Sequence, residues 1–304
     1  MNIIKKICPI LLSVSLISGL LHVSNGQMKN NKFTLAIVQM KVEGGERQKN
    51  LERAAERILE AAERGARFIL LPEAMDLGWT DPSSLTEALP VPDGQTCSFL
   101  TEMAMKYRVY ICSGLTESED NRVYNTAVII NPQGEIILKH RKINELDIGH
   151  PYYDLGDRLN VVETEFGKLG LIICADATAR DHILTRSLAY MGADVILSPS
   201  SWAMPADHDN RIEPYGDTWR NAYVPVAKAF RIWIASASNV GWMKEGPWKG
   251  WKAIGCSMVV NPDGKEVVNG PYGVDADTIL YVEIKPEPRP GQGTTWEEYW
   301  QKNR

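Results

Sequence analysis

The 304-residue chain has little of several features that mark common protein classes. Its five cysteines include no C-x-x-C pair, so neither a metal site of the zinc type nor a dense disulfide framework is expected. It has no long basic run, and 38 acidic residues outnumber 33 basic ones, so no nucleic-acid partner is expected. Its 24 glycines and 17 prolines follow no repeat, which excludes collagen-like and solenoid architectures. The remaining composition, 44% hydrophobic and 8% aromatic, is typical of a globular protein.

The first 26 residues have the pattern of a secretory signal peptide. Two lysines precede an apolar run, Ile7–Leu21, and the small residues Ser24 and Gly26 come just before the expected cleavage point. This run is shorter than the roughly 20 residues that a membrane-spanning helix needs. We therefore predict an exported protein, periplasmic or secreted, with no stable membrane insertion after cleavage. An uncleaved anchor is the alternative.

Residues 27–304 show strand and helix patterns in alternation, with residues 286–304 as a C-terminal tail. Phe33–Met40 and Phe68–Leu71 are β-rich apolar runs, and the segment between them repeats apolar residues at helical spacing as far as Gly65. Similar alternation continues to a last predicted strand, Thr278–Ile284. Helices between strands on one continuous chain predict a layered α/β domain.

Three chemically complementary side chains follow predicted strands: Glu73 in LLPEAM, Lys142 in ILKHRKINE and Cys174 in GKLGLIICAD. Loops beyond the carboxyl ends of strands carry reactive groups in α/β proteins because polar side chains there leave the core intact. A thiol needs a base to become a nucleophile, and a carboxylate shielded by apolar neighbours suits this task. A fixed ammonium stabilises the negative charge that develops on a carbonyl oxygen under attack. These residues are therefore the candidate base, oxyanion stabiliser and nucleophile.

Four segments, LLPEAM, YNTAVIINPQGEIILKHRKINE, GKLGLIICAD and IGCSMVVNPDGKEV, resemble successive signature segments of the carbon-nitrogen hydrolase (nitrilase) superfamily. The resemblance implies a four-layer α-β-β-α sandwich that works without a metal or an organic cofactor and forms a homodimer or larger homo-oligomer. It also implies that Glu73 is the general base, that Lys142 stabilises the oxyanion, and that Cys174 forms a thioester that water hydrolyses.

The loop after Lys142 departs from the family pattern. Family members place a second glutamate seven or eight residues after the lysine, where this chain has Gly149 and His150. The alternatives are an acid that reaches the site by another loop path (Glu145, Asp147 or Asp154) and a polar contact from His150.

The segment after Cys174 departs from the pattern as well. It reads ADATARD, where the family commonly has an aromatic residue and then Phe-Pro-Glu. Asp181 is the candidate replacement for that glutamate. Arg180 either pairs with a substrate carboxylate or is a solvated residue at a helix start. Trp202 and Met204 follow a predicted strand at a position that borders the acyl pocket in the family, so we expect both to contact substrate.

Other residues have plainer interpretations. Cys97, Cys112 and Cys256 lie in apolar contexts without a nearby base, so we interpret them as structural thiols and favour free thiols over disulfides, a pairing of Cys97 with Cys112 staying open. The segment GWMKEGPWKGW (Gly241–Trp251) is rich in tryptophan and glycine. It forms a mobile lid, a stacking surface, a subunit contact or a packed loop.

These observations predict an exported thiol amidohydrolase that cleaves a non-peptide carbon-nitrogen bond in a small-molecule amide or carbamoyl substrate, with amides favoured over nitriles. Two alternatives stay open. One is a catalytically silent binding protein on the same fold, suggested by the missing second glutamate. The other is an amidase-like acyltransferase, in which an amine rather than water takes the acyl group.

Overall fold

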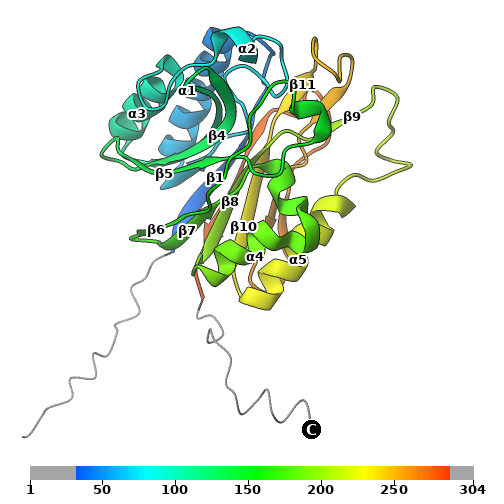
Figure 1. Ribbon diagram of the computed structural model, residues 1–304. Coiled ribbons are helices and arrows are strands. Elements are labelled where there is room, and N and C mark those ends of the chain that lie inside the picture. Colours follow the sequence, from blue (N-terminus) through cyan, green and yellow to red (C-terminus); the bar gives the residue numbers. More distant parts are fainter. Residues whose placement is uncertain (1–31, 288–304) are drawn as a thin grey trace, which may run out of the picture. The chain divides into compact units, whose positions relative to one another are not determined.

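Two six-stranded sheets lie against each other in the structure, a computed structural model that describes residues 32–287 (Figure 1). The first sheet contains, in spatial order, β15 (Thr278–Ile284), β1 (Phe33–Gln39), β2 (Phe68–Leu70), β3 (Tyr110–Glu119), β4 (Arg122–Ile130) and β5 (Ile136–Arg141). The second contains β14 (Glu266–Asn269), β13 (Met258–Val260), β10 (Trp233–Ser238), β8 (Val195–Ser200), β7 (Gly167–Leu171) and β6 (Val161–Thr164). A small third sheet contains β11 (Val240–Trp242), β12 (Lys252–Ile254) and β9 (Ala203–Met204).

Helices cover the outer face of each large sheet, so the layers follow the order helix, sheet, sheet, helix (Figure 1). The first sheet is covered by α1 (Arg47–Glu63) and α3 (Gln95–Tyr107), and the second by α4 (Ile183–Tyr190) and α5 (Asp217–Phe230). The connections contain the short helix α2 (Ser84–Glu87) and the 3₁₀ helices Asp147–Gly149, Cys174–Thr178 and Arg180–His182. The α-β-β-α sandwich that the resemblance implied is confirmed.

The apolar character of β1 follows from burial on both of its faces. Leu35 and Ile37 point into the core between the two sheets, whereas Ala36 and Val38 belong to the core beneath α1 and α3. Successive side chains of a strand point to opposite faces, so a strand covered on both sides is a continuous apolar run. The same pattern made this strand easy to predict.

Helix α1 also follows directly from its sequence. It buries Ala54 and Ile58 on the face toward the first sheet and leaves its charged residues outside. Gly65 has a φ of +82° just beyond the helix, and the amide of Ala66 donates a hydrogen bond to the carbonyl of Ala61. A glycine in this left-handed conformation ends the helix without steric cost.

Sequence patterns located most elements but missed several short strands. The strands β6, β9, β11 and β12 have two to four residues each, too few for a periodic signal. The predicted signal peptide, residues 1–26, and residues 288–304 of the predicted tail lie outside the described residues. None of the helices between residues 32 and 287 has the length and apolar character that crossing a bilayer requires.

Both sheets anchor the segment that follows β2 and thereby fix the position of Glu73. Its amide donates to the carbonyl of Ser200 in β8 (3.2 Å), and the amide of Gly114 in β3 donates to the carbonyl of Pro72 (3.0 Å). A Cβ atom on Gly114 would lie 2.5 Å from the Cα of Glu73 and 2.8 Å from the amide nitrogen of Ala74. Glycine is therefore required at position 114 by the close approach of two backbone segments.

Replacing Gly114 with alanine is expected to lower the free energy of unfolding by about 1–3 kcal/mol, because the added methyl group forces the backbone around Glu73 to move. Urea unfolding followed by tryptophan fluorescence measures the change. Gly170→Ala in β7 is the matched control, since its new Cβ would meet side-chain atoms at 3.2–3.4 Å rather than backbone. Equal losses in the two variants would contradict the requirement at Gly114.

Candidate active site

Strand ends from both sheets bring Glu73, Lys142 and Cys174 together. Glu73 lies three residues beyond the end of β2, Lys142 directly follows β5, and Cys174 begins the 3₁₀ helix after β7. All three side chains line one cavity of about 200 Å³. The three residues that the sequence motifs single out therefore share one site.

Cys174 lies in a sharp turn between a strand and a helix. Its φ of +43° is a left-handed conformation, which is costly for a residue with a side chain. The carboxylate of Asp176 holds this turn, because its Oδ2 accepts a hydrogen bond from the amide of Ile173 (2.9 Å). The strained conformation is thus maintained by a buried polar contact two residues further on.

Asp176 also fixes the chain that follows Lys142. Its Oδ1 accepts hydrogen bonds from the amides of Ile143 (3.0 Å) and Asn144 (2.7 Å). Its Oδ2 pairs with Nε2 of His140 at 2.7 Å. Burial alone would raise the pKa of Asp176, but the contacts with His140 and these backbone amides lower it. One buried carboxylate therefore sets the positions of both the nucleophile and the lysine.

The ammonium of Lys142 lies between two buried carboxyl groups. Nζ donates to Oε1 of Glu73 (2.8 Å) and to Oε1 of Glu145 (2.7 Å), and all three side chains are at most 2% exposed. Burial alone would lower the pKa of Lys142, but the neighbouring charges of Glu73 and Glu145 raise it well above its usual value. Lys142 therefore stays charged, and two of its three N–H groups are occupied.

Glu73 has one occupied and one unoccupied carboxyl oxygen. Oε1 accepts from Lys142 and from Nδ2 of Asn125 (2.7 Å), whereas Oε2 is buried and has no hydrogen-bond partner among the described residues. Burial raises the pKa of Glu73, which Lys142 opposes and Glu145 reinforces. A carboxylate of raised pKa with a free oxygen is suited to accept a proton.

Glu145, three residues after Lys142, is an acid of this loop that reaches the lysine. It contacts Lys142, and its Oε2 accepts from Nδ2 of Asn125 (3.2 Å). A Cβ atom on Gly149 would lie 2.7 Å from Cγ of Glu145, so a side chain at position 149 and the observed position of Glu145 exclude each other. Of the open alternatives, Glu145 reaches the site, whereas Asp147 and His150 are exposed on the surface.

The thiol of Cys174 is neutral in this environment. Burial and the nearby charge of Glu73 raise its pKa far above the usual value, against the opposing effects of Lys142 and the Ser201 amide. Cys174 therefore needs a base at the moment of attack, and Glu73 lines the same cavity.

Aromatic side chains form much of the remaining cavity wall. Trp202 and Trp219 stack with ring centres 4.5 Å apart, and Tyr215 lies 6.0 Å from Trp202. On the wall formed by the loop segments, Trp79 lies 5.0 Å from Trp248. Trp202 therefore lies in the cavity wall, where the sequence placed it, and four further aromatic residues line the same cavity.

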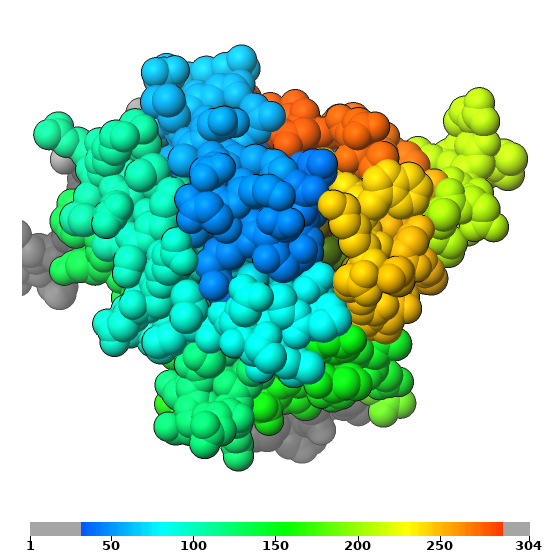
Figure 2. All heavy atoms as spheres, turned by 90° about the horizontal axis from the view of Figure 1, so that it is seen from above, coloured from blue at the N-terminus to red at the C-terminus, as the bar shows by residue number. Residues whose placement is uncertain are grey.

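Trp248 belongs to the loop that joins β11 to β12, within the tryptophan-rich segment noted in the sequence. This hairpin runs along the chain near residues 41–43: the amide of Val42 donates to the carbonyl of Val240 (3.1 Å), and Lys244 pairs with Glu43 (3.1 Å). Figure 2 shows the hairpin, in gold, beside the blue N-terminal segments, with the yellow-green loop after β9 projecting nearby. The segment is therefore a largely exposed hairpin that contributes one tryptophan, Trp248, to the cavity wall.

Three of the proposed substrate contacts do not line the cavity. Arg180 and His150 are exposed, and neither belongs to the cavity wall in the described residues. Met204 is half-buried and packs against the core between the sheets and α5, while its neighbour Ala203 lines the cavity. The alternative interpretation of Arg180, a solvated residue at a helix start, fits its position.

Several residues in and around the cavity escaped sequence analysis. Asn125 in β4 contacts Glu73 and Glu145 beside the cavity. Trp79 follows the Glu73 segment, Tyr215 lies in the loop before α5, and Trp219 lies in α5; these three line the cavity. Asn125 left a signal, since an amide inside the apolar run of a buried strand needs a polar partner. Trp219 left none, because its spacing is that of any helix face packed on a sheet, and Tyr215 lies in a loop without a periodic pattern.

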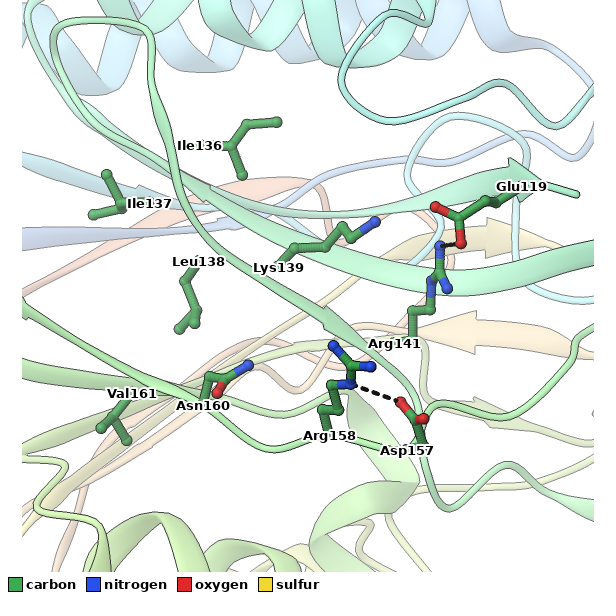
Figure 3. Close-up of a pocket in the computed structure, with 10 residues that line it drawn as sticks. All are labelled: Glu119, Ile136, Ile137, Leu138, Lys139, Arg141, Asp157, Arg158, Asn160 and Val161. Atoms are coloured by element: carbon green, nitrogen blue, oxygen red, sulfur yellow. Dashed lines mark ion pairs between the residues drawn. The ribbon is translucent and has the colours of Figure 1, made fainter.

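A larger cavity of about 660 Å³ lies between β5 and the segment before β6 (Figure 3). Its charges are satisfied within the protein: Arg141 pairs with Glu119 (2.7 Å), and Arg158 with Asp157 (3.5 Å). Its wall contains no cysteine or histidine. This cavity is larger than the one beside Cys174, but the smaller one contains the reactive groups.

The other cysteines provide no second nucleophilic site in the described part of the chain. Cys97, Cys112 and Cys256 are buried and, like Cys174, form no disulfide there. Burial raises the pKa of Cys97 to about 11 and that of Cys256 to about 12. Between residues 32 and 287, no cluster of three His, Cys, Asp or Glu side chains is arranged to hold a metal ion.

Replacing Lys142 with methionine is expected to lower the free energy of unfolding by about 3–5 kcal/mol at neutral pH, because two buried carboxyl groups lose their counter-charge. This loss of unfolding free energy should become smaller in mild acid. Burial already raises the pKa of Glu73 in the wild-type protein, and the variant removes the opposing effect of Lys142. The pKa in the folded variant should therefore lie above the unfolded value, so the folded state should gain protons and stability as the pH falls through that pKa. Urea unfolding at several pH values measures both effects.

Lys139→Met is the matched control for this variant. Lys139 also pairs with a buried carboxylate, that of Glu117 (2.8 Å), but its side chain is 34% exposed and Glu117 keeps its contact with Arg141. A loss at Lys142 that equals the control, or that does not change with pH, would contradict the buried charge arrangement.

Comparison with known proteins identifies the family of the chain. Residues 34–288 match the family model of the carbon-nitrogen hydrolases. A nitrilase from Pyrococcus abyssi is 32% identical over 232 residues, which cover 75% of this chain and 81% of the relative. Omega-amidase NIT2-A from Xenopus laevis is 29% identical, covering 83% of this chain and 88% of the relative.

Solved structures show the same fold. Nit3 from Saccharomyces cerevisiae, a member of the nitrilase superfamily, superimposes with a TM-score of 0.72 at 24% identity, covering 89% of this chain and 94% of that one. An amidase from Nesterenkonia sp. AN1, with acrylamide added to its active-site cysteine, gives 0.70 at 19% identity, covering 83% and 93%. This chain belongs to the carbon-nitrogen hydrolase (nitrilase) superfamily.

Proposed function

We propose that this protein is a thiol amidohydrolase that cleaves the carbon-nitrogen bond of a small amide or carbamoyl compound through a thioester on Cys174. The proposal rests on the polar groups of Glu73 and Lys142 that the buried hydrogen bonds leave without a partner. Glu73 keeps one unpartnered oxygen, and Lys142 keeps one N–H group, both beside a cavity that also contains the thiol. A base, an oxyanion donor and a nucleophile are the three groups that acyl transfer needs.

The first half of the reaction forms the thioester. Sγ of Cys174 attacks the carbonyl carbon as its proton moves to Oε2 of Glu73, and the remaining N–H of Lys142 donates to the oxygen that becomes negative. When the tetrahedral intermediate collapses, the carbon-nitrogen bond breaks, and Glu73 returns the proton to the departing nitrogen. Ammonia or an amine leaves, and the acyl group stays on sulfur.

The second half hydrolyses the thioester. Water attacks the same carbon while Glu73 accepts one of its protons, and Lys142 again stabilises the oxyanion. Collapse breaks the carbon-sulfur bond, releases the carboxylic acid, and returns the proton to the sulfur. Glu73 thus acts as base and acid in each half, which its raised pKa favours.

Glu145 has a positioning role in this proposal. It keeps the ammonium of Lys142 charged and directed, and through Asn125 it shares a hydrogen-bond network with Glu73. This network weakens the argument for a catalytically silent binding protein, which rested on the missing second glutamate. A binding protein would also have no need for two acids buried around one lysine, since such groups are costly to bury.

Amides are favoured over nitriles as substrates. The relatives include both omega-amidases and a nitrilase, so the comparisons alone leave the reaction open. The tetrahedral intermediate of an amide carries an oxyanion, which the free N–H of Lys142 matches. Transfer of the acyl group to an amine instead of water stays the second candidate, because the same thioester precedes both reactions.

Replacing Cys174 with alanine is expected to abolish turnover of small amides, by about 10⁴-fold or more, because the remaining groups cannot form a thioester. Glu73→Gln should reduce the rate comparably, since the amide cannot accept the thiol proton. Intact mass spectrometry of the wild-type protein with a panel of amides and carbamoyl compounds should show an acyl adduct that is absent from Cys174→Ala.

Cys97→Ala is the matched control, because Cys97 is a buried free thiol that does not line this cavity. Hydroxylamine added to the assay would divert product if an amine competes with water. Ligand binding by Cys174→Ala without any wild-type turnover or adduct would favour the silent binding protein and overturn the proposal.

We also propose that the protein is exported, periplasmic or secreted, and acts as a homodimer or larger homo-oligomer. The residue pattern of positions 1–26 supports export. Expression of the full chain in its native type of cell should yield a mature protein that starts at Gln27. Mass spectrometry of the cell fractions and the medium tests this, and an intact Met1 on the active protein would contradict it.

A further inference from the structure

The charges in the cavity wall restrict the acyl group that can enter. Among the described residues that line it, only Glu73 and Lys142 are charged, and the ammonium of Lys142 already donates to the carboxyl groups of Glu73 and Glu145. A carboxylate on the acyl part of a substrate would lose its hydration without gaining a cation of its own. The cavity therefore disfavours acidic acyl groups.

The cations considered outside the wall, Lys244, Lys249 and Arg180, do not provide a counter-charge for an acidic acyl group. The hairpin loop that carries Trp248 has two lysines, but Lys244 pairs with Glu43 (3.1 Å) and Lys249 pairs with Glu245 (3.0 Å). Arg180, the candidate for a carboxylate contact, is exposed and does not belong to the wall.

The walls offer ring surface more than hydrogen bonds. The indole N–H of Trp219 donates to the hydroxyl of Tyr215 (2.6 Å), and that of Trp79 donates to Glu145 (3.4 Å). These two N–H groups are thus engaged within the protein, whereas the buried indole N–H of Trp202 has no partner among the described residues. Stacked and tilted aromatic rings attract flat apolar groups by their area and by ring-ring contact.

The volume of the cavity sets the size of the group. It measures about 200 Å³, and an apolar cavity of about 150 Å³ is known to hold benzene. We propose that the substrate is an uncharged amide whose acyl part contains a flat apolar ring of about the size of a phenyl group. This inference rests on the proposed function, because it names the substrate class of the same site.

Two primary amides of similar shape, each with the ring on the acyl part, test the charge requirement: 2-(4-methylphenyl)acetamide and 2-(4-carboxyphenyl)acetamide. We expect kcat/KM to be about 100-fold higher for the methyl compound, because its carboxylate analogue must be buried without a counter-charge. Acetamide, which lacks the ring, should be about tenfold poorer than the methyl compound. Equal turnover of the methyl and carboxylate compounds would overturn the inference, as would acetamide matching the methyl compound.

A positive charge placed in the wall should reduce the preference for the methyl compound. Thr218 lines the cavity and is exposed at the start of α5, so Thr218→Arg adds a cation that can meet a substrate carboxylate. The ratio of methyl to carboxylate turnover should fall at least about tenfold. Ala229→Arg is the control, because it adds the same charge at the exposed far end of the same helix. An equal change in both variants would contradict a local effect.

Failure of this inference is distinguishable from failure of the proposed function. If no amide forms an adduct on Cys174, the hydrolase proposal itself is wrong. If Cys174 is acylated but the carboxylate compound reacts as fast as its methyl analogue, the hydrolase proposal stands and only the substrate class is wrong.

Discussion

The buried ammonium of Lys142 is the interaction on which the rest of the site depends. Glu73 and Glu145 lie fully inside the protein, and neither carboxyl group is stable there without a positive partner. The lysine is equally dependent on the two acids. The three groups therefore have to fold as a unit, which requires that the end of β5 and the segment after β2 meet at one place. This unit uses two N–H groups of Lys142 and one carboxyl oxygen of Glu73. The contacts that stabilise it therefore also determine which groups stay free for chemistry: the third N–H of Lys142 and the second oxygen of Glu73.

Two backbone anchors make that meeting place rigid. The amide of Glu73 is bound to Ser200 of the second sheet, so the base is fixed across the interface between the sheets. Asp176 binds the turn that holds Cys174 and the amides that follow Lys142. Each anchor joins segments distant in sequence, and the left-handed turn at Cys174 persists because these contacts over-determine it. Supporting groups of this kind hold a constellation within the tolerance that catalysis requires.

The sequence predicted what depends on local pattern and missed what depends on packing. Continuous apolar runs such as Phe33–Met40 identified buried strands, and the reactive residues after them pointed to one site. The acid that contacts Lys142 was left open because the loop path decides it: Glu145 turns back toward the lysine, and Gly149 leaves room for it. No periodic pattern in the sequence shows that an acid at position 145, rather than one at position 149, contacts the lysine. The interpretation of Arg180 as a substrate contact rested on charge type alone, and charge type does not show on which side of a turn a residue lies.

The electrostatics of the site favour a charge that appears only during the reaction. At rest the thiol is neutral, the lysine is balanced by two acids, and the rest of the wall is uncharged. A negative charge that a substrate brings with it meets no unpaired cation. An oxyanion formed at the carbonyl is different, because it arises beside the free N–H of Lys142 as the thiol proton moves to Glu73. Such an arrangement binds the transition state more strongly than the ground state, which is the condition for raising the rate rather than only the affinity. In the proposed reaction, the charge balance that would activate an amide would also select neutral acyl groups.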